Sequence, residues 1–204
     1  MSKRIKQRLV TLASVVAVCA FGVAAPAAEA NLVANGDFET GAFAPEWTLS
    51  PGGPFDHVCK TGDPIGAAIC IAHGGLYAMS FGLAGSQDTL SQNIPTAAGA
   101  TYNLSFFLAN DNPTGANTET FNVFWNGFSV FSLGSPQPTF PYTQEVILNL
   151  TATTSLTPLS FVARHDPSQW FLDDVSVARA PEPATVVLLG LGLAALGLSR
   201  RSLA

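Results

Sequence analysis

The sequence predicts an all-β fold, an antiparallel β-sandwich formed by residues 31–178. Short runs of aromatic and aliphatic residues recur along this segment, and clusters of Gly, Pro, Asn, Ser and Thr separate them. No window of helical length repeats its apolar residues every 3.6 positions. Turn residues at these intervals between short apolar runs are typical of a sandwich of several antiparallel strands.

Six strands are expected in the second half of this segment. The clearest pair flanks Asn126-Gly127, because a type I′ hairpin turn needs residues that tolerate positive φ at both central positions. The expected strands are Thr101–Ala109, Thr120–Trp125, Phe128–Leu133, Gln144–Leu150, Leu159–Arg164 and Trp170–Ala178. Core positions are expected for Trp47, Trp170, Phe106, Phe121 and Phe161. Trp125, next to the hairpin turn, is expected to be partly exposed.

The stretch from Pro51 to Gly75 is rich in loop-forming residues and contains Cys59 and Cys70. An exported chain meets an oxidising compartment, so the two cysteines are expected to form a disulfide. Closing a loop of this length would stabilise the fold by about 3 kcal/mol. The alternative is a pair of free thiols.

The first 30 residues have the layout of a cleavable signal peptide. Four basic residues precede an apolar stretch from Leu9 to Ala25, and Ala28-Glu29-Ala30 supplies a small-x-small cleavage site. The mature chain is therefore expected to begin at Asn31. A lipoprotein would use Cys19, but the large Val18 stands where a small residue is wanted.

The C-terminus has the layout of a sorting signal. A spacer at 179–183 contains Pro181, Glu182 and Pro183, and the segment 184–204 contains an apolar run followed by Arg200 and Arg201. The run, Ala184 to Leu198, would span only about 22 Å as a helix, against a hydrocarbon core of about 30 Å. A buried core helix is the alternative, but the terminal position, the prolines and the arginine pair favour a membrane segment whose basic end stays in the cytoplasm.

This order of tripeptide, apolar segment and basic end resembles the PEP-CTERM sorting signal of Gram-negative bacteria that produce exopolysaccharide. The resemblance implies recognition by an exosortase after export, with membrane anchoring through the C-terminal segment or release to the cell surface or extracellular matrix after processing. The partners that it implies are the exosortase, the secretion machinery and the membrane.

The expected mature domain is acidic. Between Asn31 and Ala180 the chain has 12 carboxylates but only three basic residues, Lys60, Arg164 and Arg179. Such a surface has no patch that could neutralise phosphates, which argues against nucleic acid as a partner. About 150 residues form a sufficient core for one domain.

Two short motifs resemble the galactose-binding-like jelly rolls that include many carbohydrate-binding modules. The mature chain opens with Asn-Leu-Val-Ala-Asn-Gly-Asp-Phe-Glu at residues 31–39 and closes with Phe-Leu-Asp-Asp-Val-Ser-Val at residues 171–177. The resemblance implies a sandwich of the jelly-roll type. Stretches around 90–111 and 164–177 also resemble small PEP-CTERM proteins made of one such domain.

The same resemblance implies one structural calcium ion where the first and last strands meet. By position, its ligands would be the carbonyl of Asp37 and the carboxylates of Glu39 and Asp173, and oxygen donors from separate segments suit calcium. Asp56 and Asp63 are candidates for the remaining ligands.

Another interpretation needs no metal at the strand junction. Asp37 would cap a turn beside Gly36, and Asp173 and Asp174 would be solvated or paired with Arg164. In a regular strand, these two neighbouring carboxylates would point to opposite faces.

The expected activity is glycan binding without catalysis. Aromatic rings stack on sugars and amides read hydroxyl groups, so Trp125, Asn126 and Tyr142 are candidate ligand-binding residues. The loops after Ala109 and around residues 134–142 have the composition of binding edges. Their partner would be envelope glycan or extracellular polysaccharide.

The alternatives are a purely structural surface or matrix protein and a glycan-active hydrolase. A hydrolase needs a nucleophile with its base or two facing carboxylates, and no motif of these kinds is present. His73-Gly74-Gly75 is interpreted as a glycine-rich turn, and His165-Asp166 as the exit of a turn before Pro167. No catalytic residue is therefore assigned.

Overall fold

The structure is a computed structural model that describes residues 30–66, 68–112, 118–181, 190 and 192. The expected signal peptide up to residue 29 and most of the expected membrane segment 184–204 lie outside these residues. In the described part of the chain, no helix combines the length and the apolar content needed to cross a bilayer.

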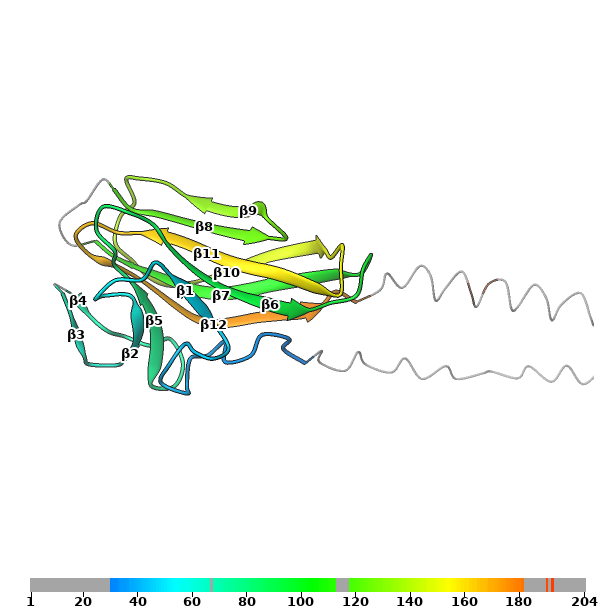
Figure 1. The fold of residues 1–204 in the computed structure, drawn as a ribbon, viewed down its shortest axis with the longest axis horizontal. Coiled ribbons are helices and arrows are strands. Elements are labelled where there is room, and N and C mark those ends of the chain that lie inside the picture. Colours follow the sequence, from blue (N-terminus) through cyan, green and yellow to red (C-terminus); the bar gives the residue numbers. More distant parts are fainter. Residues whose placement is uncertain (1–29, 67, 113–117, 182–189, 191, 193–204) are drawn as a thin grey trace, which may run out of the picture.

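Two five-stranded antiparallel sheets pack face to face (Figure 1). The first sheet contains, in spatial order, β1 (Thr48–Ser50), β6 (Asp88–Pro95), β11 (Leu156–Arg164), β8 (Thr120–Trp125) and β9 (Phe128–Leu133). The second contains β10 (Phe140–Thr151), β7 (Thr101–Asp111), β12 (Gln169–Arg179), β5 (Tyr77–Phe81) and β2 (His57–Lys60). A small hairpin of β3 (Pro64–Ile65) and β4 (Ala68–Ile69) lies beside the second sheet. The predicted all-β antiparallel sandwich is therefore confirmed.

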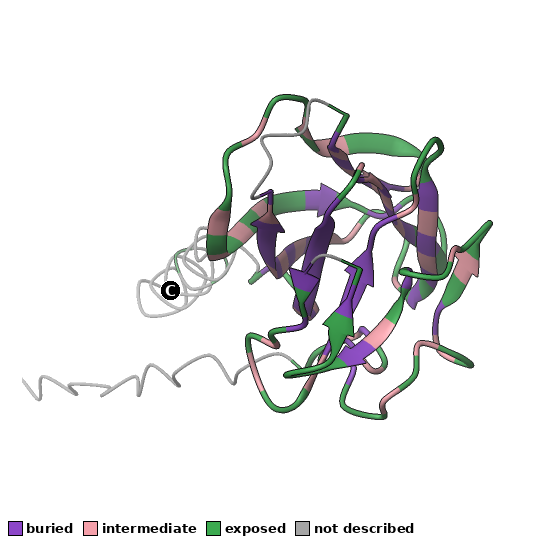
Figure 2. Cartoon of the chain, turned by 90° about the vertical axis from the view of Figure 1, so that its left-hand side faces the viewer, coloured by how far each residue is buried: buried purple, intermediate pink, exposed green. Residues whose placement is uncertain are grey.

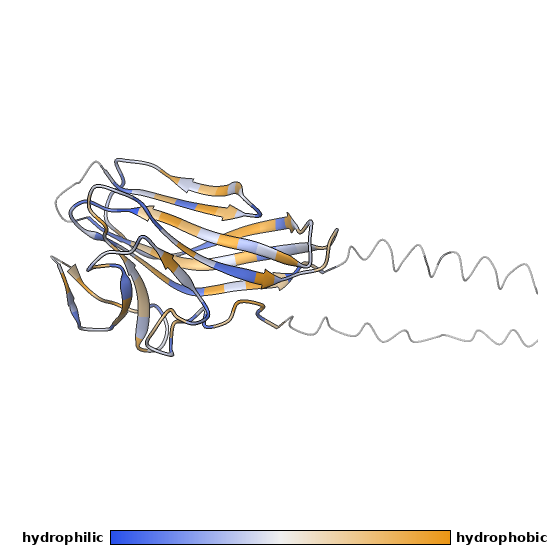
Figure 3. Cartoon of the chain, viewed as in Figure 1, coloured by the Kyte–Doolittle hydropathy of each residue, from blue (hydrophilic) through white to orange (hydrophobic). Residues whose placement is uncertain are grey.

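Alternating side chains build the core between the sheets. In β7, Tyr102, Leu104, Phe106 and Leu108 are buried, and the residues between them up to Phe107 are half-buried. The buried residues line the space between the two layers (Figure 2), and the strands alternate in hydropathy in the same way (Figure 3). This period of two places one face of each strand in the core.

The expected core aromatics are confirmed. Phe106, Phe121 and Phe161 are fully buried, with ring centroids 5.4 to 6.1 Å apart. Trp47 and Trp170 are also buried, at 1 % and 0 % exposure. Such tilted and edge-to-face ring contacts add to the free energy gained from apolar burial.

All six expected strands are present, and several are longer than expected. The hairpin turn has the required geometry, with φ of 52° at Asn126 and 80° at Gly127. The expected exposure of Trp125 is wrong. Its side chain is 3 % exposed and its indole N–H donates to the carbonyl of Thr151. Trp125 follows Phe121 and Val123 on the inward face of β8, so the strand alternation places it in the core.

The first residues of the sandwich run along its last strand. The amide N–H of Leu32 donates to the carbonyl of Val177, and that of Val175 donates to the carbonyl of Gly36. A Cβ at position 36 would lie 2.1 Å from the oxygen of Val175, so only glycine allows this approach. The two motifs that carry the family resemblance therefore lie side by side.

The sandwich has two distinct ends. The N–H of Ala180 donates to the carbonyl of Thr101, so the chain leaves the sandwich where β7 begins. Thr151, whose carbonyl accepts the indole N–H of Trp125, pairs with Thr101 across β10 and β7, so Trp125 lies at this end as well. We call this the proximal end. The distal end contains Asp111, where β7 stops after 11 residues, roughly 30 Å away.

Candidate functional site

A disulfide holds a covering segment on the outer face of the second sheet. Cys59 in β2 and Cys70 just after β4 are bonded, as expected from the sequence, with their Cα atoms 6.1 Å apart. Both sulfurs belong to a second apolar cluster that is separate from the main core. The other buried members of this cluster are Ile65, Ala68, Ala109 and Phe171. The β3–β4 hairpin is thereby packed against β7 and β12.

An open hollow of about 670 Å³ lies at the distal end between this hairpin and β10. One wall comes from the hairpin segment, the floor from β7 and β12, and the opposite wall from the start of β10. The lining residues are Ala68, Ile69, Ile71, Ala109, Asn110, Asp111, Thr139, Phe140, Pro141, Tyr142 and Phe171. Three of them are aromatic, and most of the rest are aliphatic.

Tyr142 is the predicted ligand-binding residue that lines this hollow. Its hydroxyl donates to the carbonyl of Ile71 at 2.7 Å, and its ring makes an edge contact with His73. Burial, with further contributions from Asp173 and Asp174, raises the pKa of Tyr142, so the phenol stays protonated. The ring is half-buried and fixed from both sides.

The polar groups of the hollow differ in how much they can offer a ligand. Asn110 is 1 % exposed, and its amide already donates to Pro138 and faces the Nε2 atom of His165. The Thr139 hydroxyl accepts the N–H of Asn112. The carboxylate of Asp111 is half-exposed and has no hydrogen-bond partner among the described residues. Asp111 is therefore the main free acceptor of the hollow.

A buried polar network supports the hollow from below. His165 and Glu119 are fully buried, which the sequence interpretation of a turn exit at His165 did not anticipate. Burial lowers the pKa of His165 to about 4, so the imidazole is neutral and can donate from Nε2 to Asn110. Burial opposes ionisation of Glu119, but hydrogen bonds, first from the N–H of Gln137, outweigh it and lower its pKa. Asn110 is thus held in a single orientation.

The carboxylates expected to bind calcium hold a loop in place. Oε1 of Glu39 accepts the N–H groups of Leu76 and Tyr77, both at 2.8 Å. Oδ2 of Asp173 accepts those of His73 and Gly74, at 2.8 and 3.1 Å. We call residues 73–77 the clamped loop, because Glu39 in the N-terminal turn region and Asp173 within β12 both fix its backbone.

Asp174 contacts the same loop, which corrects the expectation for a regular strand. Its carboxylate lies 2.6 Å from Nδ1 of His73, and the His73 ring stacks on Phe107 at 3.5 Å. The register of β12 shifts after Asp173, and Asp174 has a φ of 49°. This irregularity brings both neighbouring carboxylates to one loop. Arg164, their expected alternative partner, pairs with Asp166 instead.

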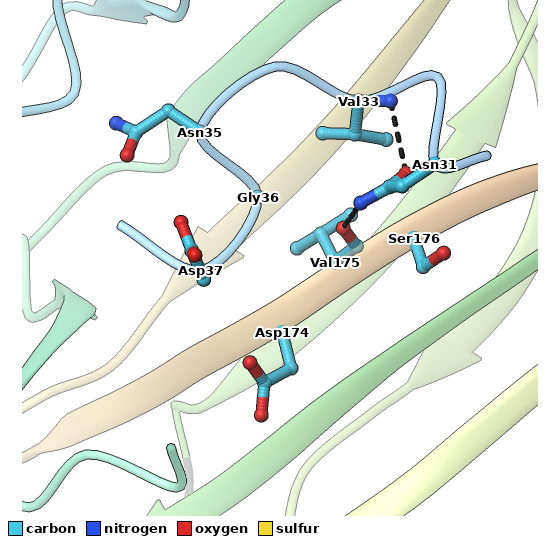
Figure 4. Close-up of a pocket in the computed structure, with 8 residues that line it drawn as sticks. All are labelled: Asn31, Val33, Asn35, Gly36, Asp37, Asp174, Val175 and Ser176. Carbon is cyan, nitrogen blue, oxygen red and sulfur yellow. Dashed lines mark hydrogen bonds between the residues drawn. The ribbon is translucent and has the colours of Figure 1, made fainter. Parts of the chain in front are cut away.

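Of the three expected calcium ligands, Glu39 and Asp173 both bind the backbone of the clamped loop. Asp37 lines a separate hollow of about 370 Å³ with Asp174, and Figure 4 shows these two carboxylates pointing away from each other. Among the described residues, no group of three or more His, Cys, Asp and Glu side chains could hold a metal ion. The expected Asp37 ligand is a backbone carbonyl, which that grouping does not include, and the calcium site stays a prediction.

The other candidate ligands of the ion are engaged elsewhere. Asp63 accepts the N–H of Lys60 through Oδ2, and Asp56 is buried next to Asp88. Asn126, a candidate ligand-binding residue, lies at the proximal end and donates to the hydroxyl of Thr153. The structure therefore separates Trp125 and Asn126 from Tyr142 by the length of the sandwich.

Comparison with known proteins identifies the C-terminal segment. Residues 179–201 match the PEP-CTERM protein-sorting motif, which includes Pro181, Glu182, Pro183, Arg200 and Arg201. No curated protein matches this chain in sequence. A motif of this kind implies export and exosortase-mediated sorting to the cell surface.

Solved structures share the fold of the sandwich. The carbohydrate-binding module TmCBM61, in complex with β-1,4-galactotriose, matches with a TM-score of 0.56 and 24 % identity over 74 % of this chain and 99 % of that one. A Stig cyclase from Fischerella sp. TAU matches with a TM-score of 0.52 and 12 % identity, over 75 % of this chain and 98 % of that one. The K3 cleaved adhesin domain of Lys-gingipain from Porphyromonas gingivalis W83 matches with a TM-score of 0.50 and 14 % identity, over 72 % of this chain and 98 % of that one.

The chain thus carries a PEP-CTERM sorting motif and a β-sandwich whose fold is shared with the carbohydrate-binding module TmCBM61. Because these three structures are less than 25 % identical to this chain, the likeness extends to the fold alone. A module, an enzyme and an adhesin domain share this fold. The function must therefore be argued from the surface of this chain.

Proposed function

We propose that this protein is displayed on the cell surface or in the extracellular matrix, where its sandwich binds envelope or extracellular glycans at the distal hollow without catalysis. The observation that supports this most directly is the hollow itself, in which the rings of Tyr142 and Phe140 lie near the free carboxylate of Asp111. Rings provide apolar surface for a sugar face, and the carboxylate accepts hydrogen bonds from its hydroxyls.

The position of the hollow fits surface display. The sandwich connects to the sorting motif at its proximal end, whereas the hollow opens at the distal end. A ligand would therefore be bound at the end of the domain farthest from the point where the chain continues towards the sorting segment. The fold is compatible with this role, since TmCBM61 carries a galactose trisaccharide on it.

The candidate pairs of titratable groups favour binding over catalysis. The His73–Asp174 pair lies at the clamped loop, and its imidazole is stacked on Phe107. No serine, threonine or cysteine side chain among the described residues forms a hydrogen bond with His73 that would make it a nucleophile. The acid pair Asp56–Asp88 is buried away from any hollow described above.

The test is a glycan array probed with the full-length protein in mild detergent. We expect retention on at least one neutral polysaccharide and its loss in the variants Tyr142→Ala and Asp111→Asn. Phe128→Ala is the matched control, because Phe128 is 72 % exposed and lies beside the hairpin turn at the proximal end. No binding to any glycan, or equal loss in the control, would leave the structural surface protein as the better explanation.

A further inference from the structure

The lining of the distal hollow indicates which glycans fit it. We infer that the hollow binds neutral glycans bearing apolar substituents, such as O-acetyl groups or the methyl group of 6-deoxy sugars, and that it discriminates against uronic acids. This inference rests on the proposed glycan-binding function and specifies its ligand class.

The first argument is the shortage of hydrogen-bond donors. The Asn110 amide is almost fully buried and already paired, and the hydroxyl of Tyr142 donates to Ile71. The Thr139 hydroxyl, which accepts an N–H, keeps one hydrogen to donate. An unsubstituted sugar ring presents several hydroxyl and ether oxygens, and burying them unpaired is unfavourable. A 6-deoxy position has no oxygen to pair, and an O-acetyl ester has only weakly accepting oxygens and adds a methyl group.

The second argument is the exposed aliphatic wall. Ile69 and Ile71 are 55 % and 58 % exposed and stand at the hollow on the disulfide-held segment, opposite Phe140 and Pro141. Contacts with methyl groups would remove this apolar surface from water. A polyhydroxylated ring alone would cover it with polar groups.

The third argument is charge. Among the described residues, Asp111 is the only carboxylate that lines the hollow, and no lysine or arginine lines it. The surrounding domain is acidic as well. A uronate carboxylate would meet a like charge with no cation to compensate it, which is unfavourable. The ligand is therefore neutral.

The decisive experiment compares one polysaccharide before and after mild alkaline removal of its acetyl groups. Full-length protein in mild detergent is titrated with acetylated glucomannan, with the same material after de-O-acetylation, with a 6-deoxyhexose-rich neutral polysaccharide and with alginate as the polyuronate. We expect binding to the first and third, affinity for the second lowered by about tenfold or more, and no binding to alginate.

A paired variant tests the aliphatic wall. Ile69→Ser/Ile71→Ser should remove the preference for the acetylated form, whereas Leu156→Ser, equally exposed but at the proximal end, should keep it. Equal affinity for both forms of glucomannan, or binding to alginate, overturns the inferred specificity while the binding function stands. Absence of binding to every polysaccharide overturns both, and thermal melts of each variant confirm that the fold is retained.

Discussion

Asp56 and Asp88 face each other inside the sandwich, although both side chains are acidic. Their side chains are 3 % and 0 % exposed, so both carboxyl groups are removed from water. Oδ1 of Asp56 accepts the N–H of Gly82, and Oδ1 of Asp88 accepts that of Gly52. Their Oδ2 atoms are buried without any other partner. Burial, and then the hydrogen bond with Asp56, raise the pKa of Asp88 to about 7, so below neutral pH Asp88 keeps a proton that it can share with the Asp56 carboxylate.

The shared proton predicts how stability depends on pH. The folded chain holds this proton up to a pKa of about 7, whereas the unfolded chain releases it near 3.8. The stabilisation from this pair is therefore complete below pH 3.8 and is lost as the pH rises through 7. Asp88→Asn should remove this dependence and raise the free energy of unfolding at pH 8 by about 2 kcal/mol, since an amide can donate to Asp56 without a titrating proton.

Urea unfolding of both proteins between pH 4 and 8 measures the effect. The difference between the two curves is the relevant quantity, because burial also raises the pKa of Asp173 to about 6 and lowers that of His165 to about 4. Those two groups titrate in both proteins. Parallel curves for variant and wild type would show that Asp88 is ionised in the fold.

The clamped loop predicts a specific cost for losing Glu39. Its Oε1 accepts two backbone N–H groups, and hydrogen bonds to a charged acceptor are stronger than neutral ones. Glu39→Gln keeps an acceptor but removes the charge, so we expect a loss of about 1 kcal/mol in the free energy of unfolding. The loss should be the same with calcium and with EGTA, as measured by thermal melts.

The same melts test the calcium site predicted from the family resemblance. If Glu39 and Asp173 ligate the ion, EGTA should lower the midpoint of the wild type and leave Glu39→Gln unchanged. That pattern would show that the carboxylates reorganise around a metal. Asp166→Asn, whose carboxylate accepts the N–H of Gly85 and which is not a candidate ligand of the ion, is a matched control for the removal of a charge.

The disulfide predicts a link between redox state and the hollow. Cys59 and Cys70 hold the segment that provides Ala68, Ile69 and Ile71 to one wall. Cys59→Ser/Cys70→Ser should lower the free energy of unfolding by about 3 kcal/mol and weaken glycan retention by uncovering Phe171. Binding that persists in a folded, reduced protein would show that the wall forms without the covalent bond.

Local signals predicted the strands better than they predicted the sites. The hairpin at Asn126-Gly127 follows from turn chemistry alone, and β7 follows from its long alternating run. By contrast, β1 to β4 have two to four residues each, too few to show a period. They form because distant strands pair with them or, for β3 and β4, because the disulfide holds their segment.

The candidate site depends on contacts between distant segments. The hollow combines residues 68–71, 109–111 and 139–142 with Phe171, and composition identified the last two loops as binding edges without showing that they meet. Asp56 and Asp88 are 32 positions apart, so no motif indicates their pairing. Trp125 could have been placed correctly, since it alternates with Phe121 and Val123. The proximity of a turn was the weaker signal.

The burial of Trp125 gives the last prediction. Its ring packs against Tyr102 at 5.9 Å and its N–H donates to Thr151, so the residue closes the proximal end of the core. Trp125→Phe loses this hydrogen bond and leaves a small cavity, which should lower the free energy of unfolding by about 2 kcal/mol. Because the hollow lies at the other end, retention on a glycan array should stay at the wild-type level. A variant that unfolds normally but no longer binds glycan would place the ligand at the hairpin turn and remove the distal hollow as the binding site.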